Sequence, residues 1–415
     1  MIELEDVFRN EWGRILSALI QALGDFDLAE EVLQEAFSSA VVQWAKGTPR
    51  NPRAWLFSTA KHKAIDIIRR RTNFTEKQVE LVIREECRTA DGIEEDSAVP
   101  DERLRLIFTC CHPALPAEAQ VALTLRTLCG LTTEEIGHAF LLPTATIAQR
   151  LVRAKTKIRK AGIPYRVPSA PDVSERLAVV MAVVYLVFNE GYSAALGDTL
   201  VRHELCAEAI RLAQLLRALL PEPEPELDAL LALMLLHDSR RSARVNANGE
   251  LVLLAEQDRT RWNRAQIDEG CALVKSVFQG GPIGPYAIEA AIAALHASAP
   301  RAEETDWRQI SALYGRLFAL HRSPVVALNR AAALSMAEGP EAALPLVEAL
   351  QSSLEDYHLW HATRADLLRR LGRTAEAVSA YQRALELAQN EVEKRFLNRR
   401  LEELSSDLSR RDQVR

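Results

Sequence analysis

The sequence predicts an all-α protein in which two small helical units precede a large, helical-repeat-like C-terminal domain with one short β-hairpin. Its 415 residues exceed what one hydrophobic core usually holds, so two to four domains are expected. Ala and Leu are abundant, aromatic residues make up only 6%, and runs of β-branched residues are scarce, a composition that favours helix. The 48% hydrophobic and 26% charged residues are typical of a soluble globular protein.

Residues 1–71 form the first unit, with three or four helices. Asp27, followed three residues later by Glu30, predicts a capping box that starts one of them. Helical spacing predicts its buried face, made of Ala29, Leu33, Ala36, Phe37, Ala40, Val41 and Trp44. The opposite face carries Glu31, Gln34, Glu35 and Ser38. Nine acidic residues against two arginines between Glu3 and Glu35 indicate a solvated face or a docking face for a basic partner.

The end of this unit is basic instead. Seven Lys or Arg and one Asp occur between Arg50 and Arg71, although the whole chain has a net charge of −6. Nucleic acid would therefore bind at such local patches. Trp55, Phe57 and His62 lie among these charges, a combination that suits single-stranded DNA. The alternative is that the aromatic rings belong to the core, which we favour for Phe57 and leave open for Trp55.

Residues 72–102 form an acidic linker, and residues 103–162 form the second helical unit. A helix-turn-helix is predicted at its end. Thr132 and Glu135 make a capping box that starts the first helix, and Leu141-Leu142-Pro143 makes the turn.

The second helix of this motif begins at Thr144 and is basic. Its apolar residues Ile147, Leu151 and Ala154 are expected to point inward, and Thr146, Gln149, Arg150 and Arg153 outward. The N-terminal part of such a helix enters the major groove of DNA, and the Lys and Arg that follow contact phosphates. The alternative is a basic helix on the surface of an ordinary helical domain. Six cations and no acid between Thr144 and Lys160 make that alternative the weaker one.

The remaining chain follows a proline-rich boundary and divides into residues 172–300 and 301–415. Asn248-Gly249 between β-forming residues predicts the hairpin. In the last part, Gly372, Ala377, Tyr381 and Ala384 match the second half of a tetratricopeptide unit, and Ala343, Val347 and Leu350 occur 34 residues earlier. An antiparallel helical array without true repeats explains these residues about as well.

No residues point to catalysis, a cofactor or a metal. The six cysteines include no CxxC pair and are expected to be reduced thiols in a cytoplasmic protein; Cys110-Cys111-His112 is expected to be buried packing. The apolar run from Leu177 to Phe188 is shorter than the roughly 20 residues that span a bilayer, and the acidic N-terminus lacks the features of a signal peptide. The polar residues on either side of the hairpin could line a pocket, but an ion-pair network is the favoured interpretation.

Three segments together resemble a known family. Leu28-Ala-Glu-Glu-Val-Leu-Gln-Glu35, Trp55-Leu56 and Ala64-Ile-Asp-Ile-Ile-Arg-Arg70 resemble region 2 of bacterial RNA polymerase sigma factors of the extracytoplasmic-function type. Residues Leu104 to Lys160 resemble their region 4. The stretch from Asp101 to Leu115 and the long helical tail resemble the subgroup with a tetratricopeptide-like C-terminal extension.

The resemblance implies a role for each motif. The residues implied to bind the polymerase β′ clamp helices are Glu30, Glu31, Gln34 and Glu35. Those implied to melt and read the −10 promoter element are Trp55, Lys61, His62, Lys63, Asp66, Arg69, Arg70 and Arg71; His62 stands where many members have Asn. Those implied to read the −35 element are Thr144, Thr146, Gln149, Arg150, Arg153, Lys155 and Lys157. The implied partners are core RNA polymerase, through the clamp helices and the β flap, and promoter DNA.

The sequence thus leads to the hypothesis of a promoter-recognition subunit without catalytic activity, cofactor or membrane contact. Its tail is expected to regulate the activity through a partner protein, a ligand or the first two units. One alternative is a helix-turn-helix regulator that does not bind polymerase. Another is a helical-repeat adaptor whose N-terminal units have lost DNA binding.

Overall fold

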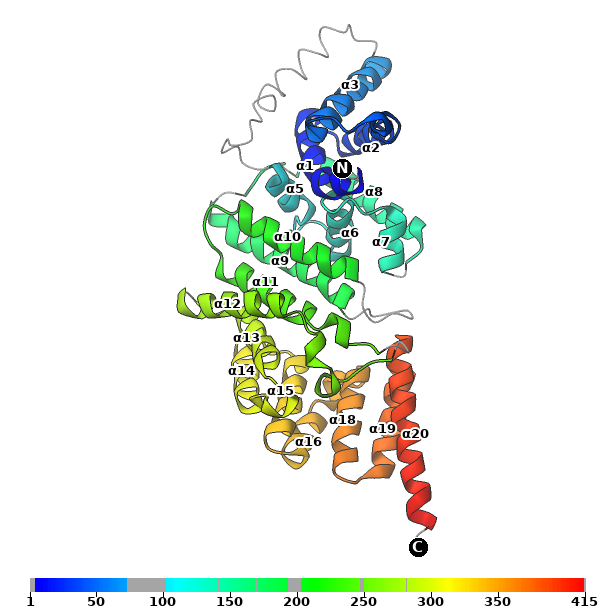
Figure 1. The fold of residues 1–415 in the computed structure, drawn as a ribbon, viewed down its shortest axis with the longest axis vertical. Helices are drawn as coiled ribbons and strands as arrows, with labels where there is room; N and C mark the ends of the chain where they lie inside the picture. The colour runs from blue at the N-terminus through cyan, green and yellow to red at the C-terminus, as the bar shows by residue number, and fades with distance from the viewer. Residues whose placement is uncertain are drawn as a thin grey trace. The chain divides into compact units, whose positions relative to one another are not determined.

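The structure, a computed structural model, describes residues 4–72, 102–140, 142–163, 165–168, 170–192, 203–246, 250–280 and 282–413 (Figure 1). The chain divides into two compact units, Met1–Leu186 and Val187–Arg415. The predicted acidic linker falls almost entirely outside the described residues. Nearly all regular structure in the described part is helical, which confirms the predicted fold class.

The first unit begins with three helices around one core. They are α1 (Leu4–Leu23), α2 (Phe26–Gln43) and α3 (Pro52–Thr72), and a short 3-10 turn η1 (Trp44–Lys46) follows α2. Trp12, Leu33 and Leu56 are almost fully buried where these helices meet. The predicted buried face of α2 is confirmed except at its end, because Val41 is 62% exposed.

The predicted cap of α2 is wrong by two residues. Asp25, in extended backbone conformation, accepts hydrogen bonds from the backbone N–H groups of Asp27 (2.8 Å) and Leu28 (3.1 Å). Asp25 is therefore the N-cap, and Asp27 lies in the first turn, where its side chain is available for other contacts.

The second group of helices in this unit contains the helix-turn-helix. Its members are α5 (Glu102–Cys110), α6 (Ala117–Thr127), α7 (Thr133–Ala139) and α8 (Thr144–Lys160). The capping box of α7 is confirmed: the Glu135 N–H donates to Thr132 Oγ1 (3.1 Å), and the Thr132 N–H donates to Glu135 Oε2 (2.6 Å). In α8 the buried residues are Ile147, Leu151, Ala154 and Ile158, as its helical spacing predicts. Leu141 of the predicted turn lies outside the described residues.

The second unit is a succession of helices in which chain neighbours pack on each other. Following α9 (Ala170–Tyr192), the helices are α10 (His203–Leu219), α11 (Pro225–Asp238), α12 (Arg264–Gly280), α13 (Pro285–Ser298), α14 (Trp307–Leu320), α15 (Pro324–Ala337), α16 (Pro340–Glu348), α17 (Gln351–Leu354), α18 (His358–Arg370), α19 (Thr374–Leu387) and α20 (Glu391–Gln413). Within the described residues, the predicted hairpin is represented by one antiparallel bridge, which joins Val245 and Leu251. The Asn248-Gly249 turn itself is not among them.

In two helix pairs near the C-terminus, the corresponding residues of the predicted repeat are buried in the same way. Ala377, Tyr381 and Ala384 of α19 are buried against α18, and Ala343 and Val347 of α16 are fully buried. Gly372 and Gly339, which precede these helices, have positive φ angles of 73° and 102°, a conformation that favours glycine. The second helices of both pairs thus share a pattern, as a repeat requires.

The polar residues around the bridge act mainly as structural ties. The Arg259 guanidinium donates to the carbonyl oxygens of His296 (2.8 Å) and Ala299 (2.6 Å) at the end of α13. The Gln266 amide donates to Asp238 Oδ2 (2.8 Å), and Arg241 lies 3.5 Å from the same oxygen. These contacts support the network that the sequence favours over a pocket.

One consequence of this network is a pH-dependent stability. Burial, with the charges of Arg240 and Arg259, lowers the pKa of His296 to about 4. In the unfolded chain His296 becomes protonated near its ordinary pKa of about 6.5. The contribution of the neutral, buried ring to the unfolding free energy is therefore complete above that pH and is lost as the pH falls toward 4. Replacing His296 by Gln should reduce the drop in unfolding free energy between pH 7 and pH 5 by about 2 kcal/mol, measured by denaturant titration. His321→Gln, at an exposed position, is the control; an unchanged pH dependence in His296→Gln would contradict the assignment.

The cysteines of the described residues are free thiols. Cys110, Cys111, Cys129 and Cys206 are buried, and Cys271 is half-buried. Within the described ranges, no group of His, Cys, Asp and Glu is arranged to hold a metal ion. No helix among these residues is long and apolar enough to cross a membrane.

Candidate protein and nucleic-acid interfaces

The outer face of α2 combines acidic and apolar side chains. Glu31, Gln34 and Glu35 are exposed, and Val42, one turn beyond Ser38, is 72% exposed. The Lys63 Nζ of α3 lies 3.0 Å from Glu35 Oε2. A shallow hollow of about 410 Å³ lies beside this pair, lined by Glu35, Ser38, Ser39, Val42, Gln43 and Lys63. The apolar atoms of this hollow lie next to charged side chains, so the face is a candidate protein-binding surface.

Glu30 does not share this face, contrary to its grouping with Glu31, Gln34 and Glu35. It is only 9% exposed, and its carboxylate is bound by Arg126 of α6 and by Lys155 of α8. Lys155 Nζ lies 2.7 Å from Glu30 Oε2 and 2.9 Å from Asp27 Oδ1. Only three of the four residues predicted to bind polymerase are therefore accessible in this conformation.

The basic helix α3 presents most of its predicted residues. His62, Asp66, Arg69 and Arg70 are exposed, whereas Lys61 and Lys63 are half-buried; the side chain of Arg71 lies outside the described residues. The ring of His62 donates from Nδ1 to the Ser58 carbonyl oxygen (2.8 Å), so Nε2 is the ring nitrogen that a further partner would meet.

The aromatic residues of α3 divide between the two interpretations. Phe57 packs with Leu23, Ile65 and Ile68 around Ala22, which confirms it as a core residue. Trp55 is half-buried, and its ring meets that of Trp44 edge-on at 5.4 Å between centroids. Part of Trp55 is thus available to a partner and part stabilises the end of α2.

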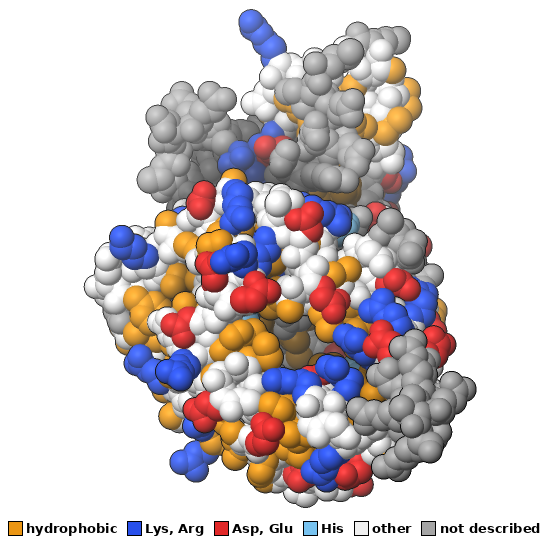
Figure 2. Space-filling model, turned by 60° about the horizontal axis from the view of Figure 1, so that its bottom comes forward, with side chains coloured by type: hydrophobic (Ala, Val, Ile, Leu, Met, Phe, Trp, Pro, Cys, Tyr) orange, Lys and Arg blue, Asp and Glu red, His pale blue; other side chains and the backbone are white. Residues whose placement is uncertain are grey.

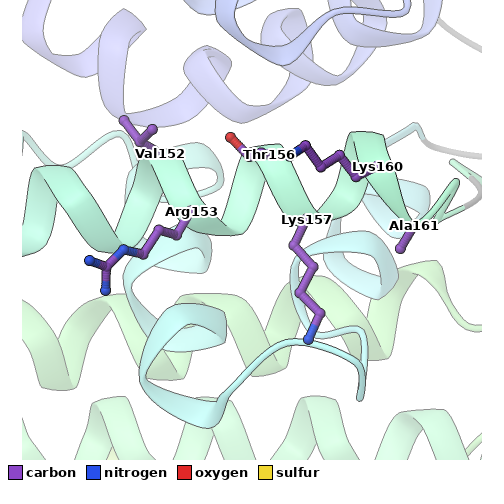
Figure 3. Close-up of a pocket in the computed structure, with 6 residues that line it drawn as sticks. All are labelled: Val152, Arg153, Thr156, Lys157, Lys160 and Ala161. Carbon is purple, nitrogen blue, oxygen red and sulfur yellow. The ribbon is translucent and has the colours of Figure 1, made fainter.

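The outer face of α8 carries cationic side chains next to exposed apolar atoms. Arg153 and Lys157 are exposed and point to the same side of the helix, one turn apart, and Val152 is 63% exposed (Figure 3). A hollow of about 450 Å³ follows this face, lined by Val152, Arg153, Thr156, Lys157, Lys160 and Ala161. Thr144 and Gln149 at the N-terminal part are exposed and Thr146 is half-buried. A polyanion could contact this face without any rearrangement of the helix.

Two of the predicted cations of α8 are engaged within the protein. Arg150 Nη2 lies 2.8 Å from Glu118 Oε2 of α6, an ion pair that is partly exposed. Lys155 is bound by Glu30 and Asp27. Burial lowers the pKa of Lys155, but the charges of and hydrogen bonds to Glu30 and Asp27 outweigh burial and raise it above its ordinary value. Lys155 is therefore charged at neutral pH, and raising the pH through its raised pKa removes the positive charge that this contact needs.

Comparison with known proteins identifies the domains that carry these faces. The sigma-70 region 2 model matches residues 9–74, and the sigma-70 region 4 model matches residues 105–158. A tetratricopeptide-repeat model matches residues 361–391. The chain belongs to the sigma-70 family, as an extracytoplasmic-function-like sigma factor with a tetratricopeptide-like extension. Residues 176–278 of this sigma factor match a family of unknown function, DUF6596.

This sigma factor has a relative that it matches over nearly the whole of both chains. An uncharacterised protein of Rhizobium meliloti (strain 1021) is 45% identical over 397 residues, which cover 94% of this chain and 93% of the relative. No solved structure matches the chain. The match at residues 361–391 confirms the predicted tetratricopeptide-like character of α18 and α19.

Sequence reasoning missed Arg126. It is the single arginine of α6, and its partner Glu30 lies 96 positions earlier in the chain. No local spacing connects two residues so far apart, so nothing in the sequence alone could have identified the pair.

Proposed function

We propose that this sigma factor directs core RNA polymerase to a class of promoters and helps to open them, with no catalytic activity of its own. Its region 2 and region 4 domains support binding to core polymerase and to promoter DNA. The observation that carries the proposal is the division of charge in the first unit. The accessible face of α2 is acidic, whereas the outer faces of α3 and α8 are basic.

Specific roles follow from this division. Glu31, Gln34 and Glu35 would dock on the polymerase clamp helices, with Val42 adding apolar contact. His62, Arg69 and Arg70 would contact the −10 strand, where single-stranded bases and phosphates are both accessible. The N-terminal residues Thr144 and Gln149 of α8 would read −35 base edges, and Arg153 and Lys157 would contact phosphates. The protein would act in the cytoplasm, together with the polymerase.

The extension, from α9 onward, is the proposed regulatory part. On the face of Figure 2, which turns the C-terminal end of the molecule toward the viewer, basic, acidic and hydrophobic side chains are interspersed. Such a mixed surface suits a protein or a small ligand better than a polyanion. A chain ending at Pro171, at the start of α9, should differ from the full chain in promoter activity or in affinity for core polymerase. Equal activity in cells and in vitro would argue against regulation.

The function is tested by transcription in vitro. Purified core polymerase, the full chain and the promoter region of its own operon should together give a transcript with a defined start site, and omission of the chain should remove it. The regulator alternative predicts tight binding to duplex DNA by the chain alone and no transcript. The adaptor alternative predicts neither.

A change in salt dependence should separate phosphate contacts from base contacts. In Arg153→Ala/Lys157→Ala, DNA binding should weaken similarly for all sequences, and the slope of log affinity against log salt should flatten by about two units, because each lost phosphate contact removes about 0.9. Fluorescence anisotropy with core polymerase present, over a range of salt concentrations, measures the slope. Lys275→Ala, an exposed cation of α12, is the control. An unchanged slope would exclude phosphate contacts by these two residues.

A further inference from the structure

Two arginines of the second unit lie against one aromatic ring. Arg244 lies over Tyr192, the last residue of α9, with its guanidinium carbon 3.7 Å from the centre of the ring. The guanidinium carbon of Arg240 lies 5.6 Å from the same centre. Arg244 is only 8% exposed, whereas Arg240 and Tyr192 are half-buried. The two cations are thus gathered at one ring, shielded from most of the water but not sealed off from it.

Two histidines belong to the same group. Arg240 Nη2 donates to His237 Nδ1 (3.4 Å), and the ring of His237 lies 4.9 Å from that of Tyr192. Burial lowers the pKa of His237 well below its ordinary value, and the charges of Arg240 and Arg244 lower it further. His296, whose pKa is lowered by burial and then by Arg240, has a buried Nδ1 atom without a hydrogen-bond partner among the described residues. We name Tyr192, His237, Arg240, Arg244 and His296 the cationic cluster.

The charges of the cationic cluster have no carboxylate partner in the part of the chain that the structure describes. The guanidinium of Arg240 hydrogen-bonds to His237, and that of Arg244 to the carbonyl oxygen of Tyr192. Glu393 of α20, whose charge reaches Arg244, contacts a histidine of α18 instead (3.2 Å). A guanidinium carries several N–H donors, and burying a charge without a partner is costly. The cluster therefore holds more positive charge and more donors than the described residues satisfy.

Other arginines of this region show how a structural role is fulfilled. Arg259 is 9% exposed, but it donates to two carbonyl oxygens at the C-terminal end of α13, and its guanidinium carbon lies 4.5 Å from the centre of the Trp262 ring. The negative end of the helix dipole compensates this charge. Arg241 lies 3.5 Å from a carboxylate oxygen of Asp238. Because the cationic cluster has no comparable compensation, its geometry indicates that a group from outside the chain supplies it.

We propose that the cationic cluster binds the oxyanion group, a phosphate or a carboxylate, of a small molecule. The planar guanidinium presents parallel N–H donors that match the oxygen atoms of such a group, and two of them at one ring would hold it from two directions. The free Nδ1 of His296 can add a hydrogen bond in the neutral tautomer that carries its proton there. Binding itself needs neither polymerase nor DNA. Its consequence, that this small molecule is the effector of the regulatory extension, rests on the proposed function.

Isothermal titration calorimetry of the full chain tests the site. Inorganic phosphate and succinate are titrated separately at constant ionic strength with chloride as the balancing ion, so that charge screening is equal throughout. At least one of them should bind saturably at one site per chain, with millimolar or tighter affinity. The anion that binds more tightly identifies the preferred head group. Saturable binding of neither would overturn the proposal.

Arg240→Gln is the informative variant, because the Arg240 side chain holds no backbone group of the protein. It should weaken anion binding about tenfold or more, since a charge-assisted hydrogen bond is lost. Arg261→Gln, at an exposed position of the 3-10 turn η4 (Arg259–Arg261), is the matched control and should bind as the wild type does. Equal affinity of Arg240→Gln and the wild type would overturn the site.

The stability of Arg240→Gln separates a binding role from a structural one. Without the anion, the variant should unfold at the same or a higher denaturant concentration than the wild type, because an uncompensated, half-buried charge has been removed. Saturating anion should stabilise the wild type and leave the variant nearly unchanged. A variant that is less stable than the wild type without the anion would show that Arg240 serves the fold and would contradict the proposal.

Protection from chemical modification tests the site in the unaltered chain. Phenylglyoxal modifies arginine side chains, and mass spectrometry of the digested protein measures the rate at each position. The saturating anion should slow modification of Arg240 several-fold and leave that of Arg261 unchanged; an unprotected Arg240 would overturn the site. None of these measurements uses polymerase. A chain that binds the anion but gives no transcript would overturn the proposed function alone, and a transcript without anion binding would overturn this inference alone.

Discussion

The double variant Glu31→Lys/Glu35→Lys is expected to abolish the start-site-specific transcript. The two residues lie one turn apart on the exposed face of α2, so both reversed charges would face the same partner. A basic docking surface would then meet two cations where it now meets two carboxylates. Like charges brought together at an interface cost several kcal/mol, so affinity for core polymerase should fall by about 100-fold or more. The transcription assay and a pull-down of core polymerase both measure the effect.

Helix α2 itself should survive these changes. Both positions are exposed, and the ion pair from Glu35 to Lys63, which the change removes, is itself partly exposed. Glu341→Lys/Glu355→Lys, two exposed positions of the extension, controls for the change in net charge. Normal transcription by the α2 variant would rule out docking through this face and would favour the regulator that does not bind polymerase.

Trp12→Ala is expected to cause the largest loss of stability. Trp12 is 2% exposed, and its ring packs against Phe8 (4.8 Å between centroids) and Phe37 (5.8 Å). Its indole nitrogen has no hydrogen-bond partner among the described residues, so the loss is one of apolar packing. Truncating a fully buried aromatic side chain costs about 3–5 kcal/mol. Denaturant titration followed by circular dichroism should show this loss in the first unit.

The same variant should also weaken the contact between regions 2 and 4, since Trp12 lies against Gly130. Trp44→Ala, which removes a half-buried indole at the end of α2, serves as the comparison and should cost much less. A loss below about 1 kcal/mol for Trp12→Ala would mean that this core is not packed as described.

Local patterns explain why much of the fold could be predicted. The Thr132–Glu135 capping box and the inward face of α8 depend on residues three or four positions apart, and both are as expected. The cap of α2 was misplaced because two aspartates, Asp25 and Asp27, lie close together and only the backbone angles distinguish them. Spacing alone cannot make that choice.

Contacts between distant segments account for the other differences. Glu30 belongs to an acidic segment that the sequence predicts to be exposed, but it is covered by two cations from helices about a hundred residues away. Val41 continues the apolar spacing of α2 but lies beyond the end of the core. Neither outcome has a local signal, since both depend on where the helices of region 4 and the end of α3 lie. The functional roles of Glu31, Gln34, Glu35 and the −10 and −35 residues remain predictions.

The adjacent thiols Cys110 and Cys111 can serve as intrinsic reporters of the opening of region 4. Burial raises the pKa of Cys111 to about 11 and that of Cys110 still higher, and their sulfur atoms contact the hydroxyl groups of Thr124 and Thr127 of α6. Neither thiol can react with an alkylating reagent until α5 and α6 separate. The raised pKa keeps each sulfur in its unreactive thiol form, and burial keeps the reagent away from it. The rate at which these two thiols are modified therefore reports how often this domain opens, in the unmodified chain and without an added probe.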